Sequence, residues 1–422
     1  MSDKMLFNIL STIFFILAIL HTFSVSLINK QAKKYKEGTF KENFFHLFGE
    51  VEIVFGFWSA VFILFSISLI NFEFTNQYLN SRNFTEALFV FVVMTICTTK
   101  PIIFFSESLL IKLSKYTPFD PKISTFYSLF FIAPLLGSFI TEPAAMSICA
   151  TLILPKYFTK NHSEKFKYAL LALLFLNVSI GGSLTPFAAP PILMVAKKWK
   201  WNWNYMLNHF ATPTILATFI NSSVIFIFFK KEILKTNLIK QNQNHSSPLI
   251  ISIIHFIFLT LIVGLSHYPI LFLGLFLFFI GFVTATKEFQ NALNLKGPLL
   301  VAFFIAGLIV IGGPQEWWLN KIINSFNSIK LFFGSIFFTA ITDNAALTYL
   351  GSLIPNLESQ SKLVLVKGSI IGGGLTIIAN SPNPLGFGIL KTAFENETLS
   401  SIKLFYYSIP LTIITILIFY YL

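Results

Sequence analysis

The sequence has 422 residues, of which 55% are hydrophobic and only 11% charged, and its mean hydropathy is +0.73. Soluble domains carry about 25% charged residues, so this chain has too few polar residues to cover a soluble core. The net charge of +12 comes from lysines and a single arginine, Arg82. These residues lie mainly in short loops between apolar blocks, which is typical of a membrane protein rather than of a nucleic-acid-binding protein. The composition predicts a polytopic helical membrane protein.

Apolar segments follow one another along the chain, and runs of at least about 18 apolar residues are typical of transmembrane helices. They lie at about 5–29, 47–72, 86–111, 123–157, 166–196, 204–229, 249–267, 270–286, 297–313, 329–357, 361–391 and 403–422. The first is too long for a signal-peptide core and lacks a small-residue cleavage site, so it is interpreted as the first span. Four segments are long and are interrupted in the middle by glycine, proline or polar residues: 123–157, 166–196, 329–357 and 361–391.

The two halves of the chain repeat each other on either side of a polar, basic stretch at 230–248. Residues 140–146 read ITEPAAM and residues 341–347 read ITDNAAL. Downstream, 181–185 read GGSLT and 372–376 read GGGLT. Because two motifs recur in the same order, each inside an interrupted segment, the chain is interpreted as two structural repeats.

The repeats and the lysine-rich loops together predict a topology. Each repeat contains three spans, a hairpin, a broken span and a final span. The lysines fit the positive-inside rule only if both hairpins are re-entrant, and five true spans per half then make the halves inverted. The fold class predicted is all-α, with about ten transmembrane helices plus two re-entrant hairpins. The predicted units are a first repeat at 1–229 with hairpin 123–157 and broken span 166–196, a linker at 230–248, and a second repeat at 249–422 with hairpin 329–357 and broken span 361–391.

The broken segments indicate a transport site. Irregular backbone at membrane depth is tolerated only where it is buried in protein or lines a water-filled cavity. Discontinuous helices at matching places in inverted repeats are typical of transporters, where unwound carbonyls ligate a cation and half-helix N-termini hold an anion. The alternative is that the glycines only allow helices to pack closely.

Glu142 and Asp343 are the acids that the repeat pairs with each other, one in each predicted hairpin. An ionisable group inside the membrane is costly and marks a functional site by default. A carboxylate here can bind a hard cation such as Na+ through oxygen or carry a proton, and competition between the two would couple them. The alternative is that either acid only caps the N-terminus of a half-helix.

Three other charged residues are candidates for proton relay or charge compensation. Glu50 and Glu52 open the second span, and at most one of them faces the interior because they point to different faces of a helix. Lys100 lies within the apolar segment 86–111, where a lysine needs a carboxylate partner or must be neutral. Lys367 is expected to extend from a helix end toward the interface.

Enzyme signatures are absent from the sequence, which has no GxSxG, HExxH, P-loop or Cys-x-x-Cys motif. Without a P-loop, ATP is not the direct energy source within this chain. The sequence therefore predicts a non-enzymatic carrier driven by an ion gradient, or a channel, with no cofactor.

Six motifs in combination resemble the putative sodium/proton antiporter family of the ion transporter superfamily, whose more distant relatives include arsenite permeases and divalent-anion/sodium symporters. The motifs are HLFGEVEIVFGFW (46–58), FVVMTICTTKP (91–101), ITEPAAMSICATLI (140–153), GGSLTPFAAPPILMVAKKW (181–199), ITDNAALTYLGSLIP (341–355) and GGGLTIIANSPNP (372–384). The resemblance implies inverted five-helix repeats with re-entrant hairpins and unwound helices. It also implies an ion site near Thr141, Glu142, Thr185, Thr342, Asp343, Asn344, Thr376 and Asn380.

Three functional hypotheses follow. The first is a secondary active antiporter that exchanges Na+ for protons by alternating access, with Na+ at Glu142 and Asp343. The second is a sodium- or proton-coupled carrier of a small anion such as a dicarboxylate or arsenite, and the third is a structural scaffold without ion flux. The partners expected are sodium, protons and the lipid bilayer, with a homodimer as one candidate assembly and no nucleic acid. The lysine, phenylalanine and isoleucine bias indicates an AT-rich bacterial genome, and for a bacterial chain the expected location of this multi-pass protein is the inner membrane.

Overall fold

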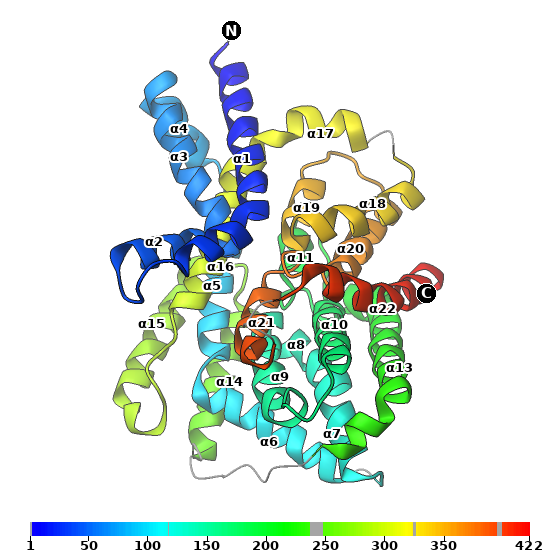
Figure 1. Cartoon of the computed structure of the whole chain (residues 1–422). Helices are drawn as coiled ribbons and strands as arrows, with labels where there is room; N and C mark the ends of the chain where they lie inside the picture. The colour runs from blue at the N-terminus through cyan, green and yellow to red at the C-terminus, as the bar shows by residue number, and fades with distance from the viewer. Residues whose placement is uncertain (1, 117, 237–247, 324–325, 395–398) are drawn as a thin grey trace.

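The computed structural model describes residues 2–116, 118–236, 248–323, 326–394 and 399–422, and over these ranges every regular element is helical (Figure 1). Six of the described helices are long and apolar enough to cross a membrane, and a bent pair adds a seventh span. The predicted all-α, multi-spanning class is confirmed. Four further apolar helices of the described ranges are shorter, with 10–17 residues: Val54–Leu69, Leu249–Gly264, Pro269–Ala285 and Ser328–Ile341.

The first apolar segments form long helices, and one of them is sharply bent. The elements are α1 (Asp3–Ala32), α2 (Phe40–Phe48), η1 (Val51–Ile53), α3 (Val54–Leu69), α4 (Phe72–Asn80), α5 (Thr85–Cys97) and α6 (Lys100–Tyr116). The bend between α5 and α6 is 64°. Thr99 lies at this bend and its hydroxyl donates to the Ile96 carbonyl, a local side-chain bond that competes with the regular helical pattern.

The next segments form the hairpin, the broken span and the final span of the first half. The elements are α7 (Pro121–Tyr127), η2 (Ser128–Ile132), α8 (Ala133–Ile140), α9 (Glu142–Tyr157), α10 (Glu164–Gly181), η3 (Gly182–Leu184), α11 (Pro190–Trp199), α12 (Trp203–Met206), η4 (Leu207–Ala211) and α13 (Thr212–Lys235). Pro190 restarts the helix as α11, since proline fits the first turn of a helix but not its interior. The predicted linker at 230–248 begins inside α13, and its residues 237–247 lie outside the described ranges.

The chain from residue 248 onward is also built of helices. They are α14 (Leu249–Gly264), α15 (Pro269–Ala285), η5 (Lys287–Phe289), α16 (Lys296–Gly312), η6 (Gly313–Gln315), α17 (Glu316–Ile323), α18 (Ser328–Ile341), α19 (Asn344–Ser352), α20 (Ser359–Gly372), α21 (Pro382–Leu390), η7 (Lys391–Ala393) and α22 (Ser401–Tyr421). Here too a proline, Pro382, restarts the helix after a glycine-rich break, so both broken spans are built from the same local signals.

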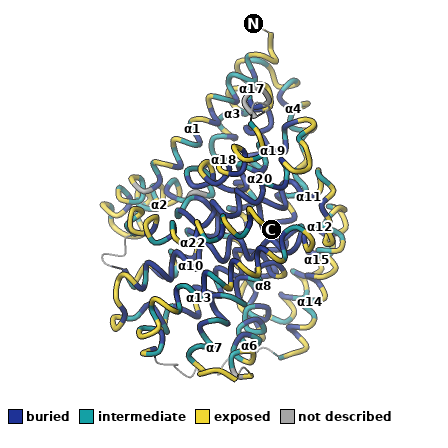
Figure 2. The backbone as a smooth tube through the Cα atoms, turned by 90° about the vertical axis from the view of Figure 1, so that its right-hand side faces the viewer, coloured by how far each residue is buried: buried dark blue, intermediate teal, exposed yellow. Residues whose placement is uncertain are grey.

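The two halves interleave around α10, which lies in the buried centre of the molecule (Figure 2). α11 of the first half packs on α19 of the second, and α21 of the second packs on α9 of the first. The broken spans α10 and α20 also meet directly. The Ser179 hydroxyl donates to the Ile370 carbonyl at 2.7 Å, and a Cβ on Gly374 would lie 2.5 Å from the Leu176 Cα. Glycine is therefore required at 374 to let the two backbones approach.

Candidate functional site

The first hairpin turns at a single residue, Thr141, between α8 and α9. Its backbone has φ 74° and ψ 151°, a conformation that costs a β-branched residue free energy. Two hydrogen bonds fasten this turn to the broken span of the same half. The Glu142 N–H donates to the Ala188 carbonyl at 3.3 Å, and the Thr185 hydroxyl donates to the Ser138 carbonyl at 2.6 Å. Contacts between the turn and the unwound segment therefore determine the position of the α9 N-terminus.

The second hairpin is fastened in the same way. The Asn344 N–H donates to the Ala379 carbonyl at 3.0 Å, and the Thr376 hydroxyl donates to the Ala340 carbonyl at 2.8 Å. Ala379 and Thr376 lie in the unwound segment between α20 and α21, as Ala188 and Thr185 lie between η3 and α11. The predicted threonines at 185 and 376 thus have equivalent contacts, and both hydroxyls are occupied by carbonyls.

Glu142 is fully buried and contacts a residue of the opposite half. Its Oε2 accepts a hydrogen bond from the Asn380 side-chain amide at 3.1 Å. Its Oε1 is buried without a partner among the described residues. A Cβ on Gly182 would lie 2.7 Å from this Oε1, so the carboxylate lies directly against the glycine break of α10. The structure brings together Glu142 and Asn380, two of the residues that the sequence predicts for the site.

Asp343 is also buried but its carboxylate is engaged by its own helix. Its Oδ1 accepts the backbone N–H of Ala345 at 2.8 Å and of Ala346 at 3.1 Å. It is the N-cap residue of α19 and has the extended backbone that this position requires. A small pocket of about 10 Å³, roughly the space of one water, reaches Asp343 and is lined by Ile19, Thr22, Phe55, Phe304, Ile341, Thr342 and Asp343.

The two hairpins differ by one residue in the position of their acids. α9 begins at Glu142 after the single turn residue Thr141, whereas α19 begins at Asn344 after Thr342 and Asp343. The backbone bond to the unwound segment is donated by Glu142 in one half and by Asn344 in the other. In terms of the backbone, Asn344 therefore occupies the place of Glu142, and Asp343 occupies the place of Thr141.

Three neutral side chains of the two hairpin turns and the second unwound segment have polar atoms that are unpartnered within the described residues. Thr141, Asn344 and Asn380 are all buried, and each has side-chain polar atoms without a hydrogen-bond partner in the described part of the chain. These atoms are Thr141 Oγ1, Asn344 Oδ1 and Nδ2, and Asn380 Oδ1. Buried polar groups normally have partners, and carboxylate, amide and hydroxyl oxygens are the ligands that hard cations prefer.

The candidate relay residues lie in different surroundings. Glu50 forms an ion pair with Lys296 at 2.7 Å, in which the lysine is largely exposed. Glu52 lies in the short helix η1, partly buried and within electrostatic range of Asp343. Lys100 begins α6 at the 64° bend and is partly exposed, rather than lying in the middle of a straight span. Of the two acids, Glu50 is therefore the one held in an ion pair, although its Oε2 is buried without a partner among the described residues.

Lys367 differs from its predicted position. It lies in the middle of α20 and is buried, and its ammonium donates to the Phe419 carbonyl at 3.3 Å. Phe419 is in the last turn of α22, where helical carbonyls lack intrahelical partners. A lysine can be buried here because a carbonyl at the C-terminal end of another helix accepts a hydrogen bond from its ammonium group. The expectation that it extends from a helix end to the interface is wrong for that reason.

Two serines and an asparagine support the breaks, and only the asparagine, Asn383, is among the polar residues that the sequence indicates around them. The Ser138 hydroxyl donates to the Gly181 carbonyl and accepts the Leu184 N–H. Ser179 joins the two broken spans through Ile370, as described above. The Asn383 amide donates to the Gly373 carbonyl at 2.8 Å and to the Thr376 carbonyl at 2.9 Å. Only Asn383 had a sequence signal, because it follows the second break within the ANSPNP motif.

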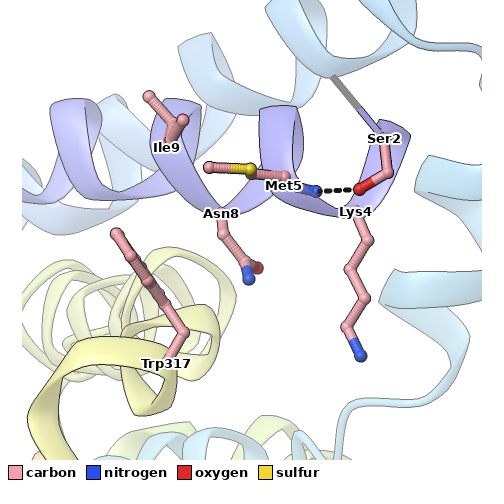
Figure 3. A pocket seen from close by; sticks show the side chains of 6 residues that line it. All are labelled: Ser2, Lys4, Met5, Asn8, Ile9 and Trp317. Atoms are coloured by element: carbon pink, nitrogen blue, oxygen red, sulfur yellow. Dashed lines mark hydrogen bonds between the residues drawn. The ribbon is translucent and has the colours of Figure 1, made fainter. Parts of the chain in front are cut away.

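A second pocket, of about 260 Å³, lies far along α1 from these turns and is lined by Ser2, Lys4, Met5, Asn8, Ile9 and Trp317 (Figure 3). Its lining has no carboxylate and no break in a helix. Among the described residues, no cluster of three or more histidine, cysteine or acidic side chains is present that would form a conventional metal centre. The chemistry available at the hairpin turns is that of one open, buried carboxylate oxygen, with the Asn380 amide on the other oxygen of the same carboxylate.

A comparison with protein families finds a match, and the matched residues include both hairpins and both broken spans. A family model described as Putative Na+/H+ antiporter matches residues 6–422. A search of curated proteins finds no match. With the apolar helices described above, this match makes the chain a multi-pass integral membrane transporter rather than an enzyme. The chain belongs to the putative Na+/H+ antiporter family.

Proposed function

We propose that this chain is a secondary active antiporter that exchanges Na+ for protons at the Glu142 carboxylate. The observation that carries the proposal is that Glu142 is fully buried, with one oxygen bound to Asn380 of the other half and one oxygen open. A buried carboxylate is costly unless a cation or a proton neutralises it. Because Na+ and a proton compete for the same carboxylate, loading one releases the other.

In this proposal the residues of the predicted ion site have two kinds of role. Asn380, which contacts the carboxylate, and the side chains of Thr141 and Asn344, unpartnered among the described residues, are the proposed sources of neutral oxygens. Thr185 and Thr376 hold the turns through their bonds to carbonyls, and the Thr342 hydroxyl donates to the Phe338 carbonyl. We place Glu52, rather than Glu50, on the proton route, because Glu50 is already paired with Lys296. Lys100 is a candidate for charge compensation at the bend.

We further propose that the chain has ten spans and two re-entrant hairpins in two inverted repeats, 1–229 and 249–422. The matching bonds from Glu142 to Ala188 and from Asn344 to Ala379 support this arrangement. Since Glu142 and Asn380 come from different repeats, rocking of one repeat against the other would open the shared site to alternate sides. The composition supports a bacterial inner membrane as the location.

The test is sodium-dependent proton movement in everted membrane vesicles that contain the full chain. After a pH gradient is formed, addition of Na+ should dequench a pH-gradient dye. Glu142→Gln keeps the shape of the side chain but removes the charge, so we expect it to lose this response at normal expression. The matched control is Glu164→Gln, because Glu164 is half-exposed and pairs with Lys403 at the surface. This control should retain the response.

Equal exchange by Glu142→Gln and the unchanged protein would refute the assigned site. Absence of any Na+ response from the unchanged protein, with sodium-dependent uptake of a labelled dicarboxylate instead, would favour an anion carrier. If the chain moves neither protons, sodium nor an anion, the hypothesis of a structural scaffold is the one that remains.

A further inference from the structure

We propose that the transport centre binds one Na+ per chain, at the Glu142 half-site, and that Asp343 is a positioning residue which binds no ion. This inference rests on the proposed exchange at Glu142. It departs from the sequence pattern, in which the repeat pairs the two acids and predicts two similar carboxylate sites. The structure gives the acids different backbone positions and different partners.

The Glu142 carboxylate is open to a ligand. Glu142 is the first residue of α9, and its side chain points to Asn380 and Gly182 instead of folding back on its own helix. Only one neutral N–H donor contacts it, and Oε1 has no partner among the described residues. One amide donor compensates a buried negative charge poorly. A monovalent cation at Oε1 would neutralise it.

The Asp343 carboxylate, by contrast, already has two protein donors on one of its oxygens. It precedes α19, and its Oδ1 accepts two backbone N–H groups of the first turn. These donors lie at the positive end of the helix, where a carboxylate is stabilised. α19 contains Asn344 near its start, so the cap determines where Asn344 is presented. Asp343 therefore acts on the site through the orientation of α19.

The second half-site is neutral because Asn344 takes the backbone place of Glu142. Its amide is buried beside the second glycine break, where a Cβ on Gly373 would lie 3.0 Å from Asn344 Nδ2 and 2.3 Å from Ser179 Oγ. The surroundings provide hydroxyl and amide groups but no second carboxylate in the place of Glu142. Asp343 is the other acid of this region, and its Oδ1 already accepts two backbone N–H groups, so Glu142 is left as the carboxylate whose open oxygen a single monovalent ion would neutralise.

Equilibrium binding of radioactive sodium-22 to the purified full chain in detergent tests this inference. The unchanged protein should bind one ion per chain, and Glu142→Gln should bind none at concentrations that saturate the unchanged protein. Asn caps a helix about as well as Asp, so Asp343→Asn should still bind one ion with little change in Kd. Asp343→Ala removes the cap and should bind more weakly, with rescue by Asn as the signature of a positioning role.

Two bound ions in the unchanged protein, or loss of binding in Asp343→Asn comparable to that in Glu142→Gln, would overturn the inference. Each of those outcomes leaves Na+/H+ exchange intact as a function. Failure of the proposed Na+/H+ exchange would give a distinct result. The unchanged protein would then bind no sodium and show no sodium-dependent proton movement. Thermal unfolding of each variant separates weakened binding from loss of the fold.

Discussion

Substitution of Gly182 by alanine tests the position of the Glu142 carboxylate without changing any charge. Gly182 has φ −73° and ψ −1°, so its backbone accepts alanine without strain. The new Cβ would lie 2.5 Å from Glu142 Cγ and 2.7 Å from Oε1. Because carbon contacts are optimal at about 3.5–4.0 Å, the side chain must move by about 1 Å. A flexible glutamate side chain can do this, so we expect the fold to be retained.

We expect the displaced carboxylate to weaken Na+ binding at the site. A misplacement of about 1 Å costs on the order of 100-fold where geometry is critical, and we expect the Na+ concentration for half-maximal exchange to rise about 10- to 100-fold. The assay is proton movement into proteoliposomes that contain a trapped pH dye, measured over a range of Na+ concentrations. Gly264→Ala is the control, since no atom lies within 4 Å of its added Cβ. An unchanged Na+ dependence in Gly182→Ala would refute the placement of the carboxylate against this glycine.

Two further predictions concern strain and pH. Thr141→Gly relieves a backbone conformation that costs about 1–3 kcal/mol, so it should raise the thermal unfolding temperature. The same substitution removes Oγ1 and should therefore weaken Na+ binding. Thr141→Ser keeps the hydroxyl and should change neither the unfolding temperature nor Na+ binding much. Burial lowers the pKa of His162, outside the spans, from its ordinary value of 6.5. The unfolded chain then binds a proton at higher pH than the folded chain, so stability should fall as pH drops below about 6.5. His162→Gln should flatten this dependence in thermal unfolding scans; an unchanged slope contradicts the reasoning.

The sequence predicted the helical class and the location of the breaks because both are local properties. Apolar runs determine where helices form in a membrane protein, and glycine followed by proline determines where a helix ends and restarts. Pro190 and Pro382 begin α11 and α21, as the repeat predicts. The match to the antiporter family confirmed the predicted membership. These features need no knowledge of tertiary contacts.

The roles of the two acids are not visible in the sequence. Alignment of ITEPAAM with ITDNAAL pairs Glu142 with Asp343, but the first hairpin turns in one residue and the second in two. That difference depends on the positive φ of Thr141, which a threonine adopts only when surrounding contacts enforce it. Lys367 is a second case, because its partner is the carbonyl of Phe419, far away in sequence. Both depend on tertiary packing.

The contact between Glu142 and Asn380 also explains why ion exchange would be coupled to movement. An ion can shift a conformational equilibrium only if it binds one conformation more tightly than the other. Glu142 comes from the hairpin of the first half and Asn380 from the broken span of the second. A cation held between them has its full set of ligands only while the two halves are aligned there, whereas a proton on the carboxylate needs no ligand from the other half. The loaded states then favour different alignments of the halves, and the glycine breaks of α10 and α20 lie where that alignment is determined.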